Sequence, residues 1–301
     1  MIKEDRVVWR AFGRSIRGMS HEKRGLVNQD AILCIAEEDA DSPVIVAVSD
    51  GHGSSSSYRS DVGAKLAVES AADCVSRLLT NKEFASDVRK LQDFVHYGLA
   101  REIHMNWKEA VDRHMNSNAA DSKLLSNSAN EKAPLDSAPT GNNTNPYLIY
   151  GATILCVGLL KKTAVFIQLG DGDILTMTSG RNPQRMLPAD KKNFANETTS
   201  LCMYDAWRYF QACSMELNGT NTPDLIIIAS DGYSNSFPAC DSDFLKIGAD
   251  YLALIQSKGY EAVCGELEDI LLRTSQKGSR DDITMGMIYR SRQQFMFMQQ
   301  R

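Results

Sequence analysis

Runs of apolar residues divide the chain into segments that we expect to be strands. Continuous or alternating apolar runs rich in β-branched residues are typical of strands. The runs Val44–Val48 and Leu225–Ala229 contain no polar residue, as in strands that are buried on both faces of a sheet. The pattern predicts strands at residues 6–18, 31–36, 43–49, 150–160, 163–169, 173–179, 224–229 and 283–289.

Apolar residues spaced three or four apart indicate amphipathic helices, each with one face directed to a core. This spacing predicts helices at residues 62–79, 88–111, 241–257 and 260–275. Strands therefore come in batches and helices in pairs, which favours an α+β fold with helix pairs packed on β-sheets. A doubly wound parallel sheet would need a helix after nearly every strand, and residues 150–179 show no helical pattern.

Two stretches lack a clear period. Residues 116–147 are rich in Asn, Ser, Ala and Pro and have little to bury, so we expect a flexible, low-complexity insertion. Residues 180–222 alternate poorly and fit neither a strand nor a helix pattern. We expect a single domain over residues 1–301, with the insertion inside it.

The composition excludes several classes of protein. Among 301 residues, 43% are hydrophobic and 24% are charged, which excludes wholesale disorder. A net charge of -5 argues against a general nucleic-acid binder, whose surface would carry a basic surplus. No apolar run approaches the roughly 20 residues of a membrane span, and the N-terminus lacks the apolar region of a signal peptide. We therefore expect no nucleic-acid or membrane partner.

The cysteines indicate the compartment. Seven cysteines are scattered along the chain without a Cys-x-x-Cys pair. An odd number without a signal peptide is typical of reduced thiols rather than of a disulfide framework or a zinc knuckle. The sequence therefore predicts a cytoplasmic protein.

An aspartate stands at the mouth of four predicted strands. Asp50 and Asp231 each follow a buried apolar run within the sequence Ser-Asp-Gly, and Asp171 follows the strand at 163–169. Asp281 lies just before the last strand. A rigid strand fixes such a carboxylate at the edge of a sheet, and a following glycine lets the backbone turn sharply. Asp-Gly after a strand is also ordinary turn chemistry, so any one of these positions alone says little.

Several carboxylates brought together need a cation, because like charges repel in a partly desolvated site. All the candidate ligands are oxygens, and no Cys/His cluster has ligand spacing. Oxygen ligands suit Mg²⁺ or Mn²⁺, with Ca²⁺ as an alternative, better than Zn²⁺ or Cu²⁺. Upstream, Arg24 lies in a basic cluster before Asp30 and could bind a phosphate oxygen in fork geometry, although a solvated turn is the alternative.

Taken together, these motifs resemble the metal-dependent type 2C Ser/Thr protein phosphatases, in a bacterial branch of that family. The order and approximate spacing of five segments carry the resemblance, which spans about residues 10–290 and leaves the insertion outside. The segments are Asn28–Ala31, Ser49–Gly53, Gly170–Asp173, Ala229–Gly232 and Gly278–Asp282.

The resemblance implies a fold and a metal site. The fold would be a four-layer α-β-β-α sandwich with central antiparallel β-sheets and flanking helix pairs. Asp50 would bridge two Mn²⁺ or Mg²⁺ ions, with the Gly51 carbonyl on one of them. Asp231 and Asp281 would complete the shell of the other ion, and Asp171 would hold a third, weaker one. Residues 180–222 fall where the family carries a mobile flap.

The resemblance also suggests catalytic residues. Asp30 would act directly or through a metal-bound water. His52 would protonate the leaving oxygen or, alternatively, serve as a turn residue that supports Asp50. Arg24 would bind phosphate, but it lies six residues before Asp30 where the family often has five, so His21 and Lys23 are rivals.

Other departures from the family pattern concern ligands. Gln29 stands where many members have glutamate, so one charged ligand is missing. Asp281-Asp282 replaces the usual Asp-Asn, and the Gly-Ser-Arg-Asp register assigns the ligand to Asp281. Asn235 stands where some members have a carboxylate that helps the third ion.

The sequence thus predicts a monomeric, bacterial-type phosphatase that hydrolyses phosphoserine and phosphothreonine on proteins with a metal-activated water. It would act on phosphoprotein substrates opposite a cognate Ser/Thr kinase in signal transduction. Two alternatives stay open at this point. One is a phosphatase-fold sensor or binding protein without turnover, and the other is a hydrolase of small phosphoesters.

Overall fold

The protein, described by a computed structural model over residues 4–36, 39, 41–54, 56–117, 145–188, 198–237 and 241–295, is built on two antiparallel sheets. The first sheet contains, in spatial order, β1 (Glu4–Ile16), β10 (Ile283–Phe295), β9 (Leu225–Ala229), β6 (Asp173–Met177) and β7 (Gln184–Arg185). The second contains β2 (Ala31–Ile35), β3 (Val44–Ser49), β4 (Ile154–Leu160), β5 (Thr163–Leu169) and β8 (Gln211–Glu216).

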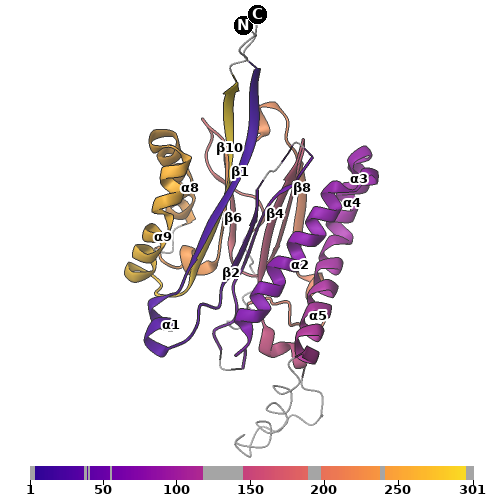
Figure 1. Cartoon of the computed structure of the whole chain (residues 1–301), viewed down its shortest axis with the longest axis vertical. Helices are drawn as coiled ribbons and strands as arrows, with labels where there is room; N and C mark the ends of the chain where they lie inside the picture. The colour runs from indigo at the N-terminus through magenta and orange to yellow at the C-terminus, as the bar shows by residue number, and fades with distance from the viewer. Residues whose placement is uncertain are drawn as a thin grey trace, which may run out of the picture.

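Helices cover the outer face of each sheet (Figure 1). The second sheet carries α2 (Ser60–Thr80), α3 (Lys82–Ser86), α4 (Val88–Tyr97) and α5 (Leu99–Ser117). The first carries α8 (Asp241–Lys258) and α9 (Tyr260–Lys277). The four layers confirm the predicted α-β-β-α sandwich. Short elements complete the described chain: α1 (Met19–Arg24), α7 (Asp231–Ser234), and the 3-10 helices η1 (Pro146–Tyr150), η2 (Ala206–Arg208) and η3 (Gly219–Asn221).

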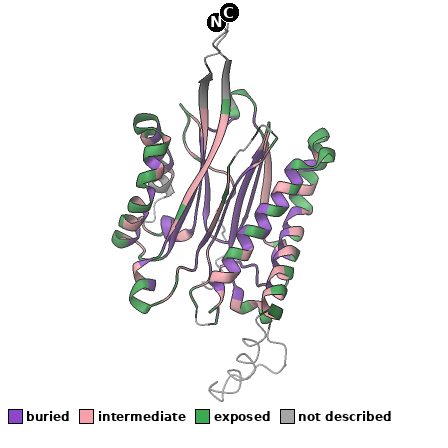
Figure 2. Cartoon of the chain, viewed as in Figure 1, coloured by how far each residue is buried: buried purple, intermediate pink, exposed green. Residues whose placement is uncertain are grey.

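Apolar side chains fill the space between each pair of layers, and buried residues concentrate on the strands and on the inner faces of the helices (Figure 2). Between the sheets, the core includes Val46, Phe166 and Ile228. This arrangement explains the unbroken apolar runs of β3 and β9, because each of these strands contacts a helix layer on one face and the other sheet on the opposite face.

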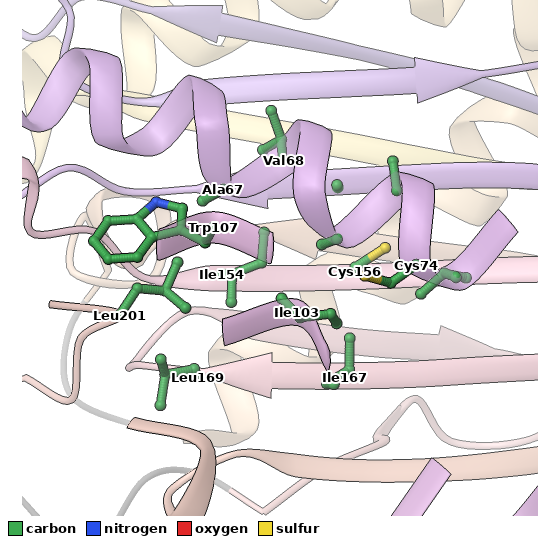
Figure 3. Packing of buried hydrophobic residues seen from close by; sticks show 14 of the residues in the cluster. Ala67, Val68, Cys74, Ile103, Trp107, Ile154, Cys156, Ile167, Leu169 and Leu201 are labelled. Atoms are coloured by element: carbon green, nitrogen blue, oxygen red, sulfur yellow. The ribbon is translucent and has the colours of Figure 1, made fainter. Parts of the chain in front are cut away.

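The core under α2 and α5 is packed around Trp107, whose ring is completely buried (Figure 3). The Trp107 indole N–H donates to the Gly63 carbonyl at 3.0 Å, so its polar atom is satisfied. A Cβ atom at Gly158 of β4 would lie 2.3 Å from Val75 Cγ1, so the glycine allows α2 to approach the sheet closely.

The structure corrects some of the expected boundaries. The helix predicted at 88–111 is two helices, because α4 ends before Gly98 and α5 begins after it. The stretch 180–222, which had no assigned pattern, contains two strands: β7, which pairs with β6, and β8, which pairs with β5.

Two expectations concern segments that are only partly described. Residues 118–144 of the predicted insertion lie outside the described residues, as do 189–197 of the predicted flap. Within the described residues, no helix is both long and apolar enough to cross a membrane.

Candidate active site

The aspartates of the sequence motifs gather at one end of the two sheets. β9 ends at Ala229, and β10 begins at Ile283 beside it because the two strands are antiparallel. Asp231 and Asp281 therefore leave the first sheet at the same edge. β3 packs against both strands and ends next to Asp50, which lies close enough to the other two aspartates to be affected by their charge.

Asp50 and Asp231 lie within hydrogen-bonding reach of each other. Burial raises the pKa of Asp50 well above its usual range, and the charges of Asp30, Asp231 and Asp281 raise that pKa further. Burial also raises the pKa of Asp231. Its hydrogen bond with Asp50 opposes this shift, whereas the charges of Asp171 and Asp281 add to it. The largest charge effects on both groups thus come from other carboxylates.

The loop that carries Asp50 is fixed by the segment before β4. The Asp50 N–H donates to Thr153 Oγ1 at 2.9 Å, and the Thr153 N–H donates to the Asp50 carbonyl at 2.8 Å. The next residue, Gly51, lies so close to neighbouring backbone that a Cβ atom there would be 2.5 Å from the Gln29 carbonyl oxygen. Only glycine fits this approach, which lets the backbone of the loop lie deep in the site.

Asp30 lies immediately before β2, where 7% of its surface is exposed. Its Oδ2 accepts a hydrogen bond from Ser230 Oγ at 2.8 Å. Burial, followed by the charge of Asp282, raises the pKa of Asp30 to about 8. The side chain is therefore a protonated acid at neutral pH unless positive charge enters the site.

The adjacent aspartates before β10 have different environments. Asp282 is 3% exposed and accepts hydrogen bonds from the N–H groups of Gly18 and Gln29, each at 2.7 Å. Its Oδ2 also lies 2.8 Å from His21 Nδ1. The Asp281 side chain is 53% exposed, and among the described residues it accepts a hydrogen bond only from the backbone N–H of Asp282, at 3.0 Å. Asp281 is thus the member of the pair whose carboxylate remains accessible to a ligand, and its role as a ligand stays a prediction.

His52 and Asp171 lie on the side of the site next to β5. Burial lowers the pKa of His52, and the charge of Asp171 partly opposes that shift. The His52 ring packs on Gly151, where a Cβ atom would lie 2.5 Å from the ring carbon Cδ2. Asp171 Oδ2 accepts a hydrogen bond from Thr198 Oγ1 at 2.7 Å. Asp171 thus influences both His52 and Asp231.

The three candidate basic residues before β2 differ in how far their side chains are buried. Arg24, the last residue of α1, is exposed and makes no hydrogen bond or ion pair with the described residues. Lys23 is exposed too, whereas His21 is buried and faces Asp281 and Asp282. The structure therefore brings His21, and not Arg24, into contact with the aspartates.

Sequence reasoning missed three hydroxyl residues that hold these aspartates: Thr153 bonds the backbone of Asp50, whereas Thr198 and Ser230 donate to the carboxylates of Asp171 and Asp30. Ser230 had a local signal, because it belongs to the second Ser-Asp-Gly motif. Thr153 and Thr198 had none, since their partners lie far away in the sequence.

The donor set fits a hard divalent cation. In the part of the chain that the structure describes, no group of three or more His, Cys, Asp or Glu side chains is arranged so that it could hold a metal ion as it stands. Several carboxylates nonetheless converge, and each raises the pKa of another. Excess negative charge from oxygen ligands is the condition that a bound Mg²⁺ or Mn²⁺ ion relieves.

Comparison with known proteins gives a consistent picture. Residues 17–271 match the family model described as protein phosphatase 2C. That match includes Asp30, Asp50, Asp171 and Asp231 and ends before Asp281. A search of curated proteins found no match.

Solved structures share the fold at low identity. PppA, described as a key regulatory component of T6SS in Pseudomonas aeruginosa, has a TM-score of 0.55 and 16% identity, covering 95% of this chain and 100% of its own. The catalytic domain of the serine threonine protein phosphatase PstP, in complex with 2 manganese ions, has a TM-score of 0.55 and 14% identity, covering 95% and 99%. The S. agalactiae serine/threonine phosphatase has a TM-score of 0.52 and 13% identity, covering 93% and 99%.

Proposed function

The chain belongs to the protein phosphatase 2C family and is a metal-dependent protein serine/threonine phosphatase, and from this premise we propose that the aspartate cluster at the end of its sheets is the catalytic centre. The observation that carries the proposal is the approach of Asp50 and Asp231 to within hydrogen-bonding reach. Two buried carboxylates at this separation repel unless a proton or a cation lies between them.

We propose that the aspartates share the binding of two ions. Asp50 would contribute to both ions, the Gly51 carbonyl would bind one of them, and Asp231 and Asp281 would bind the other. Asp171 would hold a third, weaker ion. The ligands are all oxygens, which suits Mn²⁺ or Mg²⁺, and the similar PstP domain was solved with 2 manganese ions. When bound, such ions lower the pKa of water and offset charge on a phosphoryl group.

The neighbouring side chains handle protons and phosphate. Asp30 retains a proton in the metal-free protein because its pKa is raised to about 8, and incoming cations favour the release of that proton. His52 is neutral at pH 7 because burial lowers its pKa, so it must take up a proton before it can donate one to the leaving seryl or threonyl oxygen. The charge of Asp171 favours that uptake.

Arg24 is the proposed contact for a phosphoryl oxygen. Its guanidinium is exposed and has no partner among the described residues, so it is available for a bidentate bond to a substrate. In this arrangement the substrate lies between α1 and the aspartates.

The cellular setting is part of the proposal. We place the protein in the bacterial cytoplasm as a monomer that opposes a Ser/Thr kinase in signal transduction. The free state of Cys34, Cys74, Cys156, Cys202, Cys213 and Cys264 supports a reducing compartment.

The decisive experiment measures hydrolysis of a phosphothreonine peptide. Activity should disappear when EDTA removes the metal and return when Mn²⁺ or Mg²⁺ is added. A nucleotide and a small aryl phosphate serve as comparison substrates. Full activity after verified metal removal would reject the mechanism, and a strong preference for the nucleotide would reject the substrate class.

A further inference from the structure

His21 is held in one orientation by Asp282. The Asp282 carboxylate accepts hydrogen bonds from the backbone N–H groups of Gly18 and Gln29, and it lies 2.8 Å from His21 Nδ1. Asp282 is 3% exposed and is surrounded by donors, so it acts as an acceptor towards the imidazole. Nδ1 is therefore the donor of this hydrogen bond. The other ring nitrogen, Nε2, is left to face the site.

The partner that His21 Nε2 faces is Asp281. The two atoms His21 Nε2 and Asp281 Oδ1 are 3.8 Å apart, which is too long for a direct N–H···O hydrogen bond. Two ligands of one divalent ion, each about 2.1 Å from it, lie roughly 3 to 4 Å apart. The separation thus matches a pair of ligands with an ion between them better than it matches a hydrogen bond.

A second acceptor borders the same space. Gln29 is 7% exposed, and its Oε1 has no hydrogen-bond partner among the described residues. The Gln29 amide nitrogen donates to Ser60 Oγ at 2.9 Å, which fixes the orientation of the amide. A Cβ atom at Gly53 would lie 3.6 Å from Gln29 Oε1 and 3.6 Å from His21 Nε2. The missing side chain of Gly53 therefore leaves room beside both acceptors.

We propose that His21 Nε2 is a nitrogen ligand of the ion held at Asp281, in a site where Gln29 supplies a neutral oxygen. The inference rests on the proposed function, because it concerns one of the ions of that centre. Asp282, His21 and the ion form the carboxylate–histidine–metal arrangement in which a buried carboxylate fixes the ligating tautomer.

The nitrogen ligand affects which metal binds. Mg²⁺ strongly prefers oxygen ligands, whereas imidazole favours transition metals. In a centre whose other ligands are oxygens, one histidine shifts the preference towards Mn²⁺ and away from Mg²⁺. His21 is therefore a specificity-determining residue for the metal.

The direct test is pulsed EPR of Mn²⁺, added below one equivalent to the metal-free protein. We expect a ¹⁴N coupling that becomes a ¹⁵N coupling when only the histidines are labelled with ¹⁵N. His21→Gln should lose the coupling, and the matched control His52→Gln should keep it. Should His21→Gln fail to fold, the labelled His52→Gln protein decides, because His21 is then the only described imidazole in contact with Asp281.

A metal titration gives a second readout that does not depend on turnover. His21→Gln should weaken Mn²⁺ binding about tenfold or more while changing Mg²⁺ binding less, and Asp282→Asn should weaken Mn²⁺ binding through loss of the fixed tautomer, also about tenfold. Tight Mn²⁺ binding without a histidine coupling overturns this inference alone. Failure of the wild-type protein to bind Mn²⁺ at all overturns both this inference and the proposed metal centre.

Discussion

Strand β9 has an aspartate beyond each end, and the two aspartates have opposite environments. Before the strand, Asp224 forms an ion pair with Arg290 and accepts the Ser179 N–H at 2.7 Å. Burial alone would raise the pKa of Asp224, but these donors outweigh burial and lower it. After the strand, burial and neighbouring carboxylates raise the pKa of Asp231.

The difference shows which of the two aspartates has no positive side chain beside it among the described residues. Asp224 is paired with Arg290, whereas the negative charge around Asp231 calls for a bound cation. Strand β10 supplies Arg290 to Asp224 and begins close to Asp281, whereas the loops after β3 and β5 of the other sheet bring Asp50 and Asp171 near Asp231. Buried groups of like charge destabilise the fold, so such an arrangement persists where it serves a ligand. We therefore interpret the end of β9 at Asp224 (the far end) as structural, and we propose that the end at Asp231 (the near end) binds cations.

The largest expected effect is on turnover at the near end. Asp50→Asn or Asp231→Asn removes a charged ligand without changing its shape, so phosphopeptide turnover should fall by roughly a hundredfold or more. The metal-free variants should melt at the same temperature as the wild type or above it, because a repulsion is lost. Steady-state kinetics and thermal melts measure the two effects.

Asp224→Asn is the matched control for this change, because it removes a carboxylate from the other end of the same strand. Its turnover should stay near that of the wild type. Near-normal turnover in a well-folded Asp50→Asn or Asp231→Asn protein would contradict the proposal that the Asp231 end of β9 is catalytic and the Asp224 end is not.

The second prediction concerns pH and the metal-free protein. The pKa of Asp30 is raised to about 8 in the folded state and is about 4 in the unfolded chain, so the folded state binds the proton more tightly. The free energy of unfolding should therefore fall by a few kcal/mol as pH rises from about 4 to about 8. Urea unfolding at several pH values should show this slope, and Asp30→Asn should flatten it. An unchanged slope in Asp30→Asn would contradict the assignment.

Asp224 should show the opposite sign and a smaller effect. Its pKa is lowered in the folded state, so its contribution to stability is present above about pH 4 and is lost as pH falls through the folded pKa. Asp224→Asn leaves Arg290 without its charged partner and should cost about 1–3 kcal/mol of unfolding free energy at pH 7. Urea unfolding of this variant at pH 7 measures the loss of stability, and the same measurement below pH 4 tests whether the loss disappears when Asp224 is protonated. A variant as stable as the wild type would show that the ion pair contributes nothing.

The smallest effect is expected at Asp171. Asn235 stands where some members of the family have a carboxylate that helps this ion, so a hard divalent ion should bind weakly at Asp171. Asp171→Ala should lose a weak class of metal site in a titration, keep the tight class, and impair the phosphopeptide several-fold more than a small aryl phosphate. If the tight sites are empty in this variant, Asp171 is a ligand of the two tightly bound ions and not of a third ion.

Much of the fold could be predicted because its signals are local. The unbroken apolar runs that form β3 and β9 identify buried strands, and the Ser-Asp-Gly that follows each run places an aspartate at a strand end. β8 was missed because it is an edge strand with half-buried side chains, held by backbone pairing with β5 rather than by an apolar pattern. The apolar pattern continues across Gly98, so it predicted one helix where the structure has α4 and α5.

The site was predictable in its residues and less so in their partners. Asp282 could be separated from Asp281 by motif register, but its bonds to Gly18, His21 and Gln29 depend on contacts across most of the chain. Burial likewise distinguishes His21 from Arg24, and nothing in the local sequence indicates which of the two points inward. Side-chain direction on a short helix is determined by tertiary packing.

The pairing of β1 with β10 governs when this enzyme can mature. Residues 4–16 pair with 283–295 along their whole length, so β1 has this partner only after β10 has been synthesised. Contacts of such long sequence separation form slowly, and an unpaired strand edge invites association with other chains in the meantime. Gly18 and His21 also contact Asp282, so the proposed metal centre cannot form until the start of β10 is in place. A chain that lacks β10 should therefore have no activity.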